Sequence, residues 1–198
     1  SMPKEIAECK TEEFSCTAND AFATIKISVK NESEESYSKI LDYLCNLLEF
    51  GFSHSYAIEF KGQNKIYLPI KKLPKKGVNQ LFANAIIYPK LHDKIERYAN
   101  LAMKEFEWHL NLDGEYSAMP GTFAVFALGL YDEKYHELVC DYLAHCDGEH
   151  QSIQGEFVLA YIEKFGFTEK GFELYKLCEE NIQELPKKLV FLYKKSAR

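Results

Sequence analysis

A weak internal repeat in the C-terminal part of the chain limits the fold more than any other feature. Residues 121–128 (GTFAVFAL) begin a segment that ends with EKYHEL at 133–138, and residues 155–162 (GEFVLAYI) begin one that ends with EKGFEL at 169–174. The offset is 34 residues at the two glycines and 36 at the two leucines. Such a period is typical of stacked helical hairpins, because each pair of short helices buries its apolar face against the next pair. The repeat predicts a HEAT-like stack whose role is surface contact.

The N-terminal part predicts a small antiparallel sheet with one helix. The first twenty residues are charged and indicate irregular structure. Residues 22–29 then alternate as in a half-buried strand, with Ile25, Ile27 and Val29 on one face. Residues 36–50 place apolar side chains on one face of a helix. Residues 55–60 and 65–70 predict two further strands joined by a tight hairpin turn.

Helical patterns fill the rest of the chain after a basic linker at residues 71–77. The helices that we expect cover residues 78–88, 89–110, 121–131, 133–146, 151–165, 169–182 and 187–195. The sequence therefore predicts a predominantly helical α+β protein. A β-α-β-β unit at 1–74 and a helical-hairpin domain at 75–198 are expected, with one continuous domain as the alternative.

Composition sets further bounds. The 198 residues are 46% apolar, and no apolar run approaches the roughly 20 residues that a membrane-spanning helix needs. The first residues resemble neither a signal peptide nor a transit peptide, so we expect a cytoplasmic protein without a membrane partner. The six cysteines form no C-x-x-C pair, which indicates reduced, buried thiols and no disulfide framework.

Charge is divided unevenly along the chain. Residues 105–180 hold 16 acidic and 4 basic side chains, whereas residues 1–104 hold 13 acidic and 15 basic side chains. Phosphate contacts need lysine and arginine, and opposite charges speed the association of proteins. The acidic region therefore argues against a nucleic-acid partner and in favour of a basic protein. The lysines between Lys61 and Lys76 could bind nucleic acid or anionic lipid, but lysines on a predicted edge strand also prevent edge pairing.

Two groups of residues could carry chemistry. Cys140, His145, Cys146 and His150, with His136 one helical turn before Cys140, include the ligand types of zinc sites. Their spacing matches no familiar zinc finger, so we interpret them as buried thiols and surface imidazoles and predict no metal or cofactor. Asp147 and Glu149 lie in a turn between two repeat helices, where such residues commonly cap a helix. No phosphate-binding, nucleophile-elbow or HExxH motif occurs, and we predict that the chain is not an enzyme.

Trp108 stands among carboxylates near the end of helix 89–110, with Glu105 and Glu107 before it and Asp113 and Glu115 after it. Aromatic residues rimmed by charge are typical anchors of protein interfaces. A single tryptophan is also a common core residue, so both interpretations stay open.

Several stretches carry a resemblance to known proteins. They are residues 121–132, 140–143, 147–154 and 161–168. Together they resemble a family of poorly characterised bacterial proteins and also helical immunity proteins encoded beside polymorphic toxins, over roughly residues 85–190. The resemblance implies a protein that binds and blocks a cognate toxin, and it offers no catalytic residues.

Our leading hypothesis is an immunity-type protein that neutralises a basic toxin through an acidic helical surface. The residues expected to contact the partner are Glu105, Glu107, Trp108, Asp113, Glu115, Asp132, Glu133, Asp147 and Glu149. One alternative is a helical-repeat adaptor in a bacterial complex. Another is a metal-dependent hydrolase that uses Asp147, Glu149, His145 and His150. The identity of the partner and the oligomeric state stay open.

Overall fold

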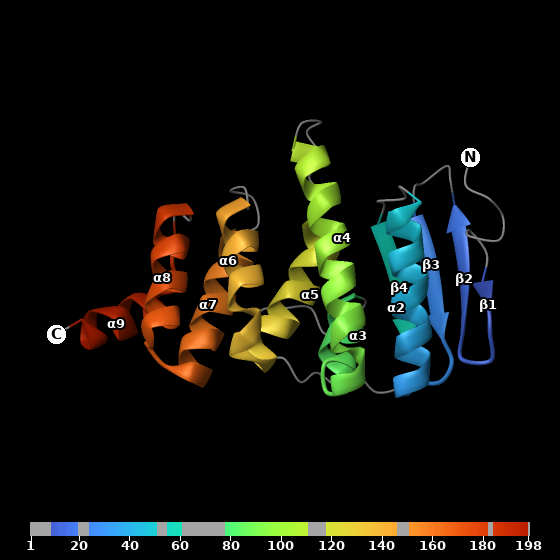
Figure 1. Cartoon of the computed structure of the whole chain (residues 1–198), viewed down its shortest axis with the longest axis horizontal. Helices are drawn as coiled ribbons and strands as arrows, with labels where there is room; N and C mark the ends of the chain where they lie inside the picture. Colours follow the sequence, from blue (N-terminus) through green and yellow to red (C-terminus); the bar gives the residue numbers. More distant parts are fainter. Residues whose placement is uncertain are drawn as a thin grey trace. The chain divides into compact units, whose positions relative to one another are not determined.

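The computed structural model describes residues 9–19, 24–50, 55–60, 78–110, 118–145, 151–181 and 184–197. They belong to two compact units, residues 1–67 with 74–124 and residues 68–73 with 125–198. The boundary that we expected at residues 74 and 75 lies outside the described residues, as does the strand expected at 65–70. The predominantly helical α+β fold with a small N-terminal sheet is confirmed (Figure 1).

The sheet of the N-terminal unit has four strands in the order β1-β2-β3-β4. They are β1 (Cys9–Lys10), β2 (Phe14–Asn19), β3 (Thr24–Val29) and β4 (Ser55–Phe60). The first three pair antiparallel, but β1 and β2 are not the strands that we expected to pair with residues 22–29. β4 instead pairs parallel to β3. The helix between them carries the chain back to the end of the sheet at which β3 begins, so the three elements form a β-α-β unit.

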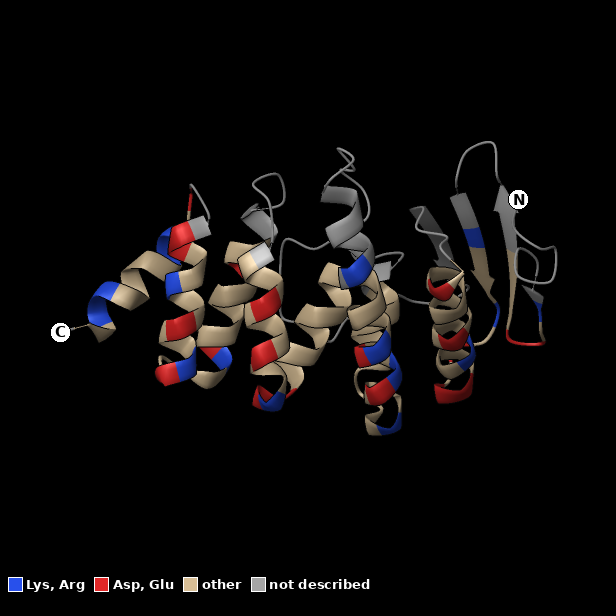
Figure 2. Ribbon diagram, turned by 45° about the horizontal axis from the view of Figure 1, so that its top comes forward, with Lys and Arg blue, Asp and Glu red and all other residues tan. Residues whose placement is uncertain are grey.

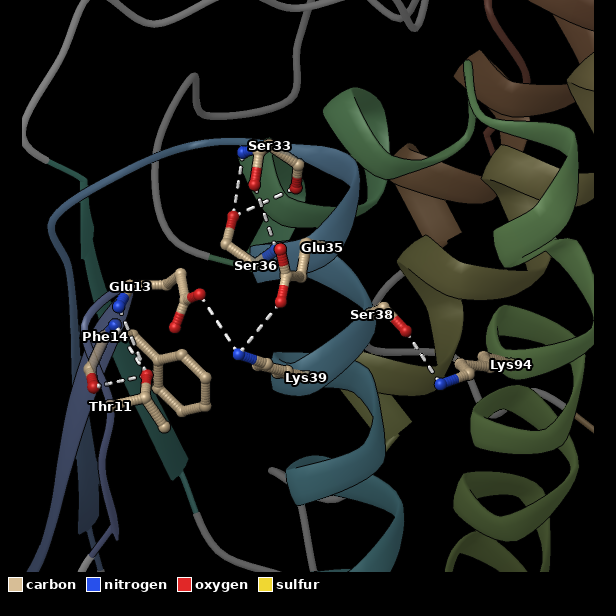
Figure 3. A network of polar contacts seen from close by, with 9 residues as sticks. All are labelled: Thr11, Glu13, Phe14, Ser33, Glu35, Ser36, Ser38, Lys39 and Lys94. Carbon is tan, nitrogen blue, oxygen red and sulfur yellow. Dashed lines mark hydrogen bonds and ion pairs between the residues drawn. The ribbon is translucent and has the colours of Figure 1, made fainter.

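The expectation of irregular structure in the first twenty residues is wrong at β1 and β2. Phe14 and Cys16 alternate with polar residues and are buried, which is the pattern of a half-buried strand. The Thr11 hydroxyl accepts a hydrogen bond from the Phe14 backbone N–H at 3.1 Å and closes the turn before β2 (Figure 3). Charged residues concentrate in that turn, and the apolar-polar alternation of β2 beside them is only a few residues long. The sequence pattern therefore did not indicate a strand there.

Helix α2 (Glu34–Glu49) is the crossover between β3 and β4. It begins with a capping box, in which the Ser33 hydroxyl accepts from the Ser36 N–H at 3.1 Å and the Ser36 hydroxyl accepts from the Ser33 N–H at 2.8 Å (Figure 3). Its apolar face is fully buried, as the sequence predicted, and the Tyr43 ring lies 6.4 Å from that of Phe14 on β2. The helix thus packs its apolar face on the sheet and toward α4.

Two helices complete the N-terminal unit before the chain reaches α5. Helix α3 (Val78–Ala85) is shorter than the expected 78–88, because a turn follows it before Pro89. Pro89 opens the 3-10 helix η1 (Pro89–Leu91), which leads into α4 (His92–Leu110). Ile95, Tyr98 and Ala102 form the buried stripe of α4. Lys94 ties α4 to α2 through an ion pair with Asp42 at 2.7 Å.

The C-terminal unit consists of successive helical hairpins. The first joins the end of α5 (Ala118–Tyr131) through η2 (Glu133–Tyr135) to α6 (His136–His145), and the second joins α7 (Gln151–Phe165) to α8 (Glu169–Asn181). α8 packs against both α6 and α7. The Phe126 and Phe157 rings stack at 4.2 Å in the core between the hairpins.

Residues about one repeat apart contact each other across the stack. Lys164 donates to the backbone carbonyl of Leu130, 34 residues earlier, and His136 contacts Glu173, 37 residues later. Separations close to the repeat period are expected when equivalent helices of neighbouring hairpins lie side by side. The internal repeat is therefore a structural repeat.

A last helix, α9 (Lys187–Ser196), packs on α7. Its Tyr193 ring stacks on that of Tyr175 in α8 at 3.9 Å and an angle of 10°.

The cysteines whose side chains are described are buried and form no disulfides, as expected. They are Cys16, Cys45, Cys140 and Cys178. Among the described residues, no helix combines the length and the apolar character needed to cross a bilayer.

Candidate functional site

The structure places only two of the nine predicted partner-binding residues in full. Asp132 and Glu133 lie at the start of η2 and are half-buried. Glu105, Glu107 and Trp108 lie in the last turns of α4, where the backbone alone is described. The remaining four lie outside the described residues, and they are Asp113, Glu115, Asp147 and Glu149. The predicted contact set therefore stays a prediction.

Asp132 and Glu133 have local structural roles. The Asp132 carboxylate caps η2 by accepting a hydrogen bond from the Lys134 N–H at 3.0 Å. The Glu133 backbone carbonyl accepts a hydrogen bond from Lys170 at 3.5 Å, which links the two hairpins. Neither role removes the negative charge of these side chains from the surface.

A larger acidic surface lies on α6 and α8. We define this acidic face by five exposed carboxylates on the two neighbouring helices, which are Glu137, Asp141, Glu169, Glu173 and Glu180. Figure 2 shows the acidic residues of both helices on the same side of the C-terminal unit. The arrangement follows from the repeat, because α6 and α8 are the equivalent second helices of neighbouring hairpins.

A polar cluster of three residues lies where α8 packs on α6. Glu173 Oε2 lies 2.9 Å from His136 Nε2, and Cys140 Sγ lies 3.4 Å from the same nitrogen and 3.7 Å from Glu173 Oε1. His136 and Cys140 are one helical turn apart on α6 and are buried, whereas the Glu173 side chain is 54% exposed. The cluster thus joins a buried pair of donor atoms to a carboxylate at the surface.

The protonation of this cluster follows from burial and charge. Burial raises the pKa of the Cys140 thiol to about 12, and the negative charges of Glu173 and Glu137 add to this shift. The hydrogen bond from His136 lowers the pKa of Glu173 below its usual range. With no metal bound, the group at neutral pH therefore holds a thiol and a carboxylate, not a reactive thiolate.

This cluster differs from the zinc candidate in the sequence. Cys140 and His145 lie on α6, but the His145 side chain is not described and Cys146 and His150 lie outside the described residues. His136 is beside Cys140 as its spacing suggested, and Glu173 is the residue that sequence reasoning missed. The repeat could have indicated it, since Glu173 lies 37 residues after His136.

The fold and this surface define the class of protein, which is a helical α+β protein with stacked hairpins, an acidic face and a His-Cys-Glu cluster. The model of a family of unknown function, DUF6138, matches residues 3–184, and the chain belongs to that family. No curated protein and no solved structure matches the chain. The resemblance to a poorly characterised family is thereby confirmed, and the likeness to immunity proteins gains no support from the comparisons.

Proposed function

We propose that this protein is a binding protein that docks on a basic partner protein through the acidic face of α6 and α8. In the more specific form that the resemblance to immunity proteins suggests, the partner is a toxin and binding blocks its activity. One observation carries the proposal: the stacking of α6 on α8 gathers five exposed carboxylates on adjacent helices.

Charge on such a surface acts on both rate and specificity. Complementary potentials raise association rates and disfavour partners of like charge. Three lysines, Lys134, Lys170 and Lys176, lie near the acidic face, and Lys176 pairs with Glu179 at 3.5 Å. Exposed ion pairs of this kind contribute only about 0–1 kcal/mol to stability. Breaking one so that its carboxylate can pair with a lysine or arginine of the partner therefore costs little.

The helices under the acidic face pack through aromatic rings. Tyr142 of α6 lies edge-on to Phe126 of α5 at 5.6 Å, and Phe126 stacks on Phe157 of α7 at 4.2 Å. A preorganised surface loses little conformational freedom on binding, which favours affinity.

The proposal is tested with the full chain and the product of the gene that neighbours its own. Glu137→Gln with Asp141→Asn removes two charges from the acidic face, and Glu12→Gln with Asp93→Asn removes two exposed charges from the N-terminal unit. We expect the first pair to slow association severalfold at low salt and the second pair to leave it unchanged. Absence of a complex with the neighbouring product, together with no relief of its toxicity on co-expression, contradicts the toxin form. Equal effects of the two pairs contradict the assignment to α6 and α8.

A further inference from the structure

The three residues where α6 meets α8 are arranged as metal ligands. We propose that His136 Nε2, Cys140 Sγ and one carboxylate oxygen of Glu173 bind a divalent transition metal, Zn²⁺ first among them. This site shares Glu173 with the acidic face, but metal binding can be measured without a partner, so its failure would leave the docking proposal untouched.

The spacing of the donor atoms fits a tetrahedral zinc site. Zinc bonds of about 2.0–2.1 Å to nitrogen, 2.3 Å to sulfur and 2.0–2.2 Å to oxygen place any two ligand atoms about 3.3–3.6 Å apart. The observed separations are 3.4 Å for nitrogen and sulfur, 2.9 Å for nitrogen and oxygen, and 3.7 Å for sulfur and the other oxygen. All three donor atoms lie within 4.8 Å of one another. Shifts of about half an ångström, within reach of the exposed Glu173 side chain, complete the geometry.

With no metal bound, Glu173 accepts hydrogen bonds from both neighbours, from His136 Nε2–H at 2.9 Å and from the Cys140 S–H at 3.7 Å. A ring nitrogen carries either one hydrogen or one lone pair in the ring plane, so it makes one well-aligned bond. His136 Nε2 faces two neighbours, the Glu173 oxygen and the Cys140 sulfur. A cation between the three atoms would replace these hydrogen bonds. On binding, the hydrogen on His136 Nε2 moves to Nδ1, which frees the Nε2 lone pair for the metal, and the Cys140 thiol proton leaves to solvent.

The ligand types select the metal. Imidazole and thiolate suit zinc, whereas magnesium and calcium prefer oxygen ligands in larger number. Three protein ligands leave a fourth position for water on the side of Glu173, whose side chain is 54% exposed. Three protein ligands with one open position are the arrangement of catalytic zinc sites, whereas structural sites are closed by four.

One feature limits the affinity. Zinc-binding histidines usually donate their second ring N–H to a carboxylate or a carbonyl, and loss of that bond lowers affinity about 10- to 100-fold. His136 Nδ1 is buried and has no hydrogen-bond partner in the described part of the chain. We therefore expect binding in the micromolar range and not at the tightness of a structural zinc site.

The test uses the full chain, without a histidine tag, after treatment with a chelator. Competition against a chromophoric chelator measures Zn²⁺ affinity, and Co²⁺ absorption reports a thiolate ligand by its charge-transfer band in the near ultraviolet. We expect one Zn²⁺ per chain and a thiolate band with Co²⁺. The substitutions His136→Asn, Cys140→Ser and Glu173→Gln should each weaken Zn²⁺ binding about tenfold or more, and Cys140→Ser should abolish the band.

Two control variants separate ligation from folding. Cys178→Ser changes another buried thiol of the same unit, and Glu180→Gln changes another exposed carboxylate of α8. Both should bind Zn²⁺ as the unaltered chain does. The substitutions of His136 and Cys140 change buried side chains and could unfold the unit. Glu173→Gln changes a side chain at the surface, so it tests metal binding even if those two variants do not fold. Absence of Zn²⁺ binding by the unaltered chain, or unchanged affinity in any of the three ligand variants, overturns the proposal.

Discussion

His136 and Glu173 are 37 residues apart in the sequence, and their side chains meet at 2.9 Å between Nε2 and Oε2. The contact joins α6 to α8, which are equivalent helices of two neighbouring hairpins. Stacked repeats bring residues one period apart to the same level of the stack. This one pair therefore links the internal repeat, the acidic face and the candidate metal site.

The N-cap of α2 should contribute measurably to the stability of the N-terminal unit. Ser33→Ala removes the oxygen that accepts the Ser36 N–H and should lower the free energy of unfolding by about 1 kcal/mol. Urea unfolding measures the loss. Ser33→Asp restores an acceptor and should recover most of the stability. Equal unfolding midpoints for Ser33→Ala and the unaltered chain would show that the cap contributes nothing.

The ion pair between Lys39 and Glu13 should make stability depend on pH. Lys39 Nζ lies 3.0 Å from Glu13 Oε1 and 3.2 Å from Glu35 Oε1, which joins α2 to the turn before β2 (Figure 3). The hydrogen bond from Lys39 lowers the pKa of Glu13 below its ordinary value of 4.5. Because the folded pKa is lowered, the stabilisation is present above about pH 4.5 and is lost as pH falls through the folded pKa.

The same pair sets an alkaline limit. The hydrogen bond to Glu13 raises the pKa of Lys39 above 10.5, so its stabilisation is present below that pH and is lost as pH rises through the folded pKa. Carboxyl NMR titration of Glu13 and unfolding curves against pH measure both limits. Glu13→Gln should flatten the acid side of the curve, and Glu12→Gln, a change at the neighbouring exposed carboxylate, should not. An ordinary pKa for Glu13 would disprove the pairing.

Gly129 should be intolerant of a side chain. A Cβ atom there would lie 2.6 Å from Val139 Cγ2 and 3.1 Å from Phe157 Cζ, inside the packing between α5, α6 and α7. Gly129→Ala should therefore destabilise the C-terminal unit by about 1–3 kcal/mol, although alanine favours helix. Thermal unfolding measures the cost. Adding Val139→Ala should relieve the overlap, so the double variant should be more stable than the sum of the single effects predicts. Strict additivity would contradict this account.

The stacking of Tyr193 on Tyr175 should hold α9 in place. Tyr193→Ala should cost about 1–3 kcal/mol and raise the rate of amide hydrogen exchange throughout α9. Phe191 lies two residues earlier on the same helix and is 63% exposed, so Phe191→Ala is the matched control and should change stability by less than about 0.5 kcal/mol. Similar exchange in the two variants would show that the stack does not anchor the helix.

Local sequence patterns predicted many of the elements, because helical and strand periods are visible without tertiary information. Residues 151–165 and 55–60 form the helix and the strand at the bounds expected for them. Boundaries were less accurate where a 3-10 turn intervened, as at Glu133–Tyr135 before α6. The short strands β1 and β2 were missed, because an alternation of a few residues is weak beside a dense run of charges.

The sequence by itself determined the helical repeat, the buried faces of the helices and the uneven charge, since these depend on residue type and spacing along one chain. The tertiary structure decided that β4 runs parallel to β3, and it brought Glu173 to His136 and Cys140. The reason is physical: strand direction and contacts between helices depend on how distant segments pack, and no local period encodes the register of one helix against another.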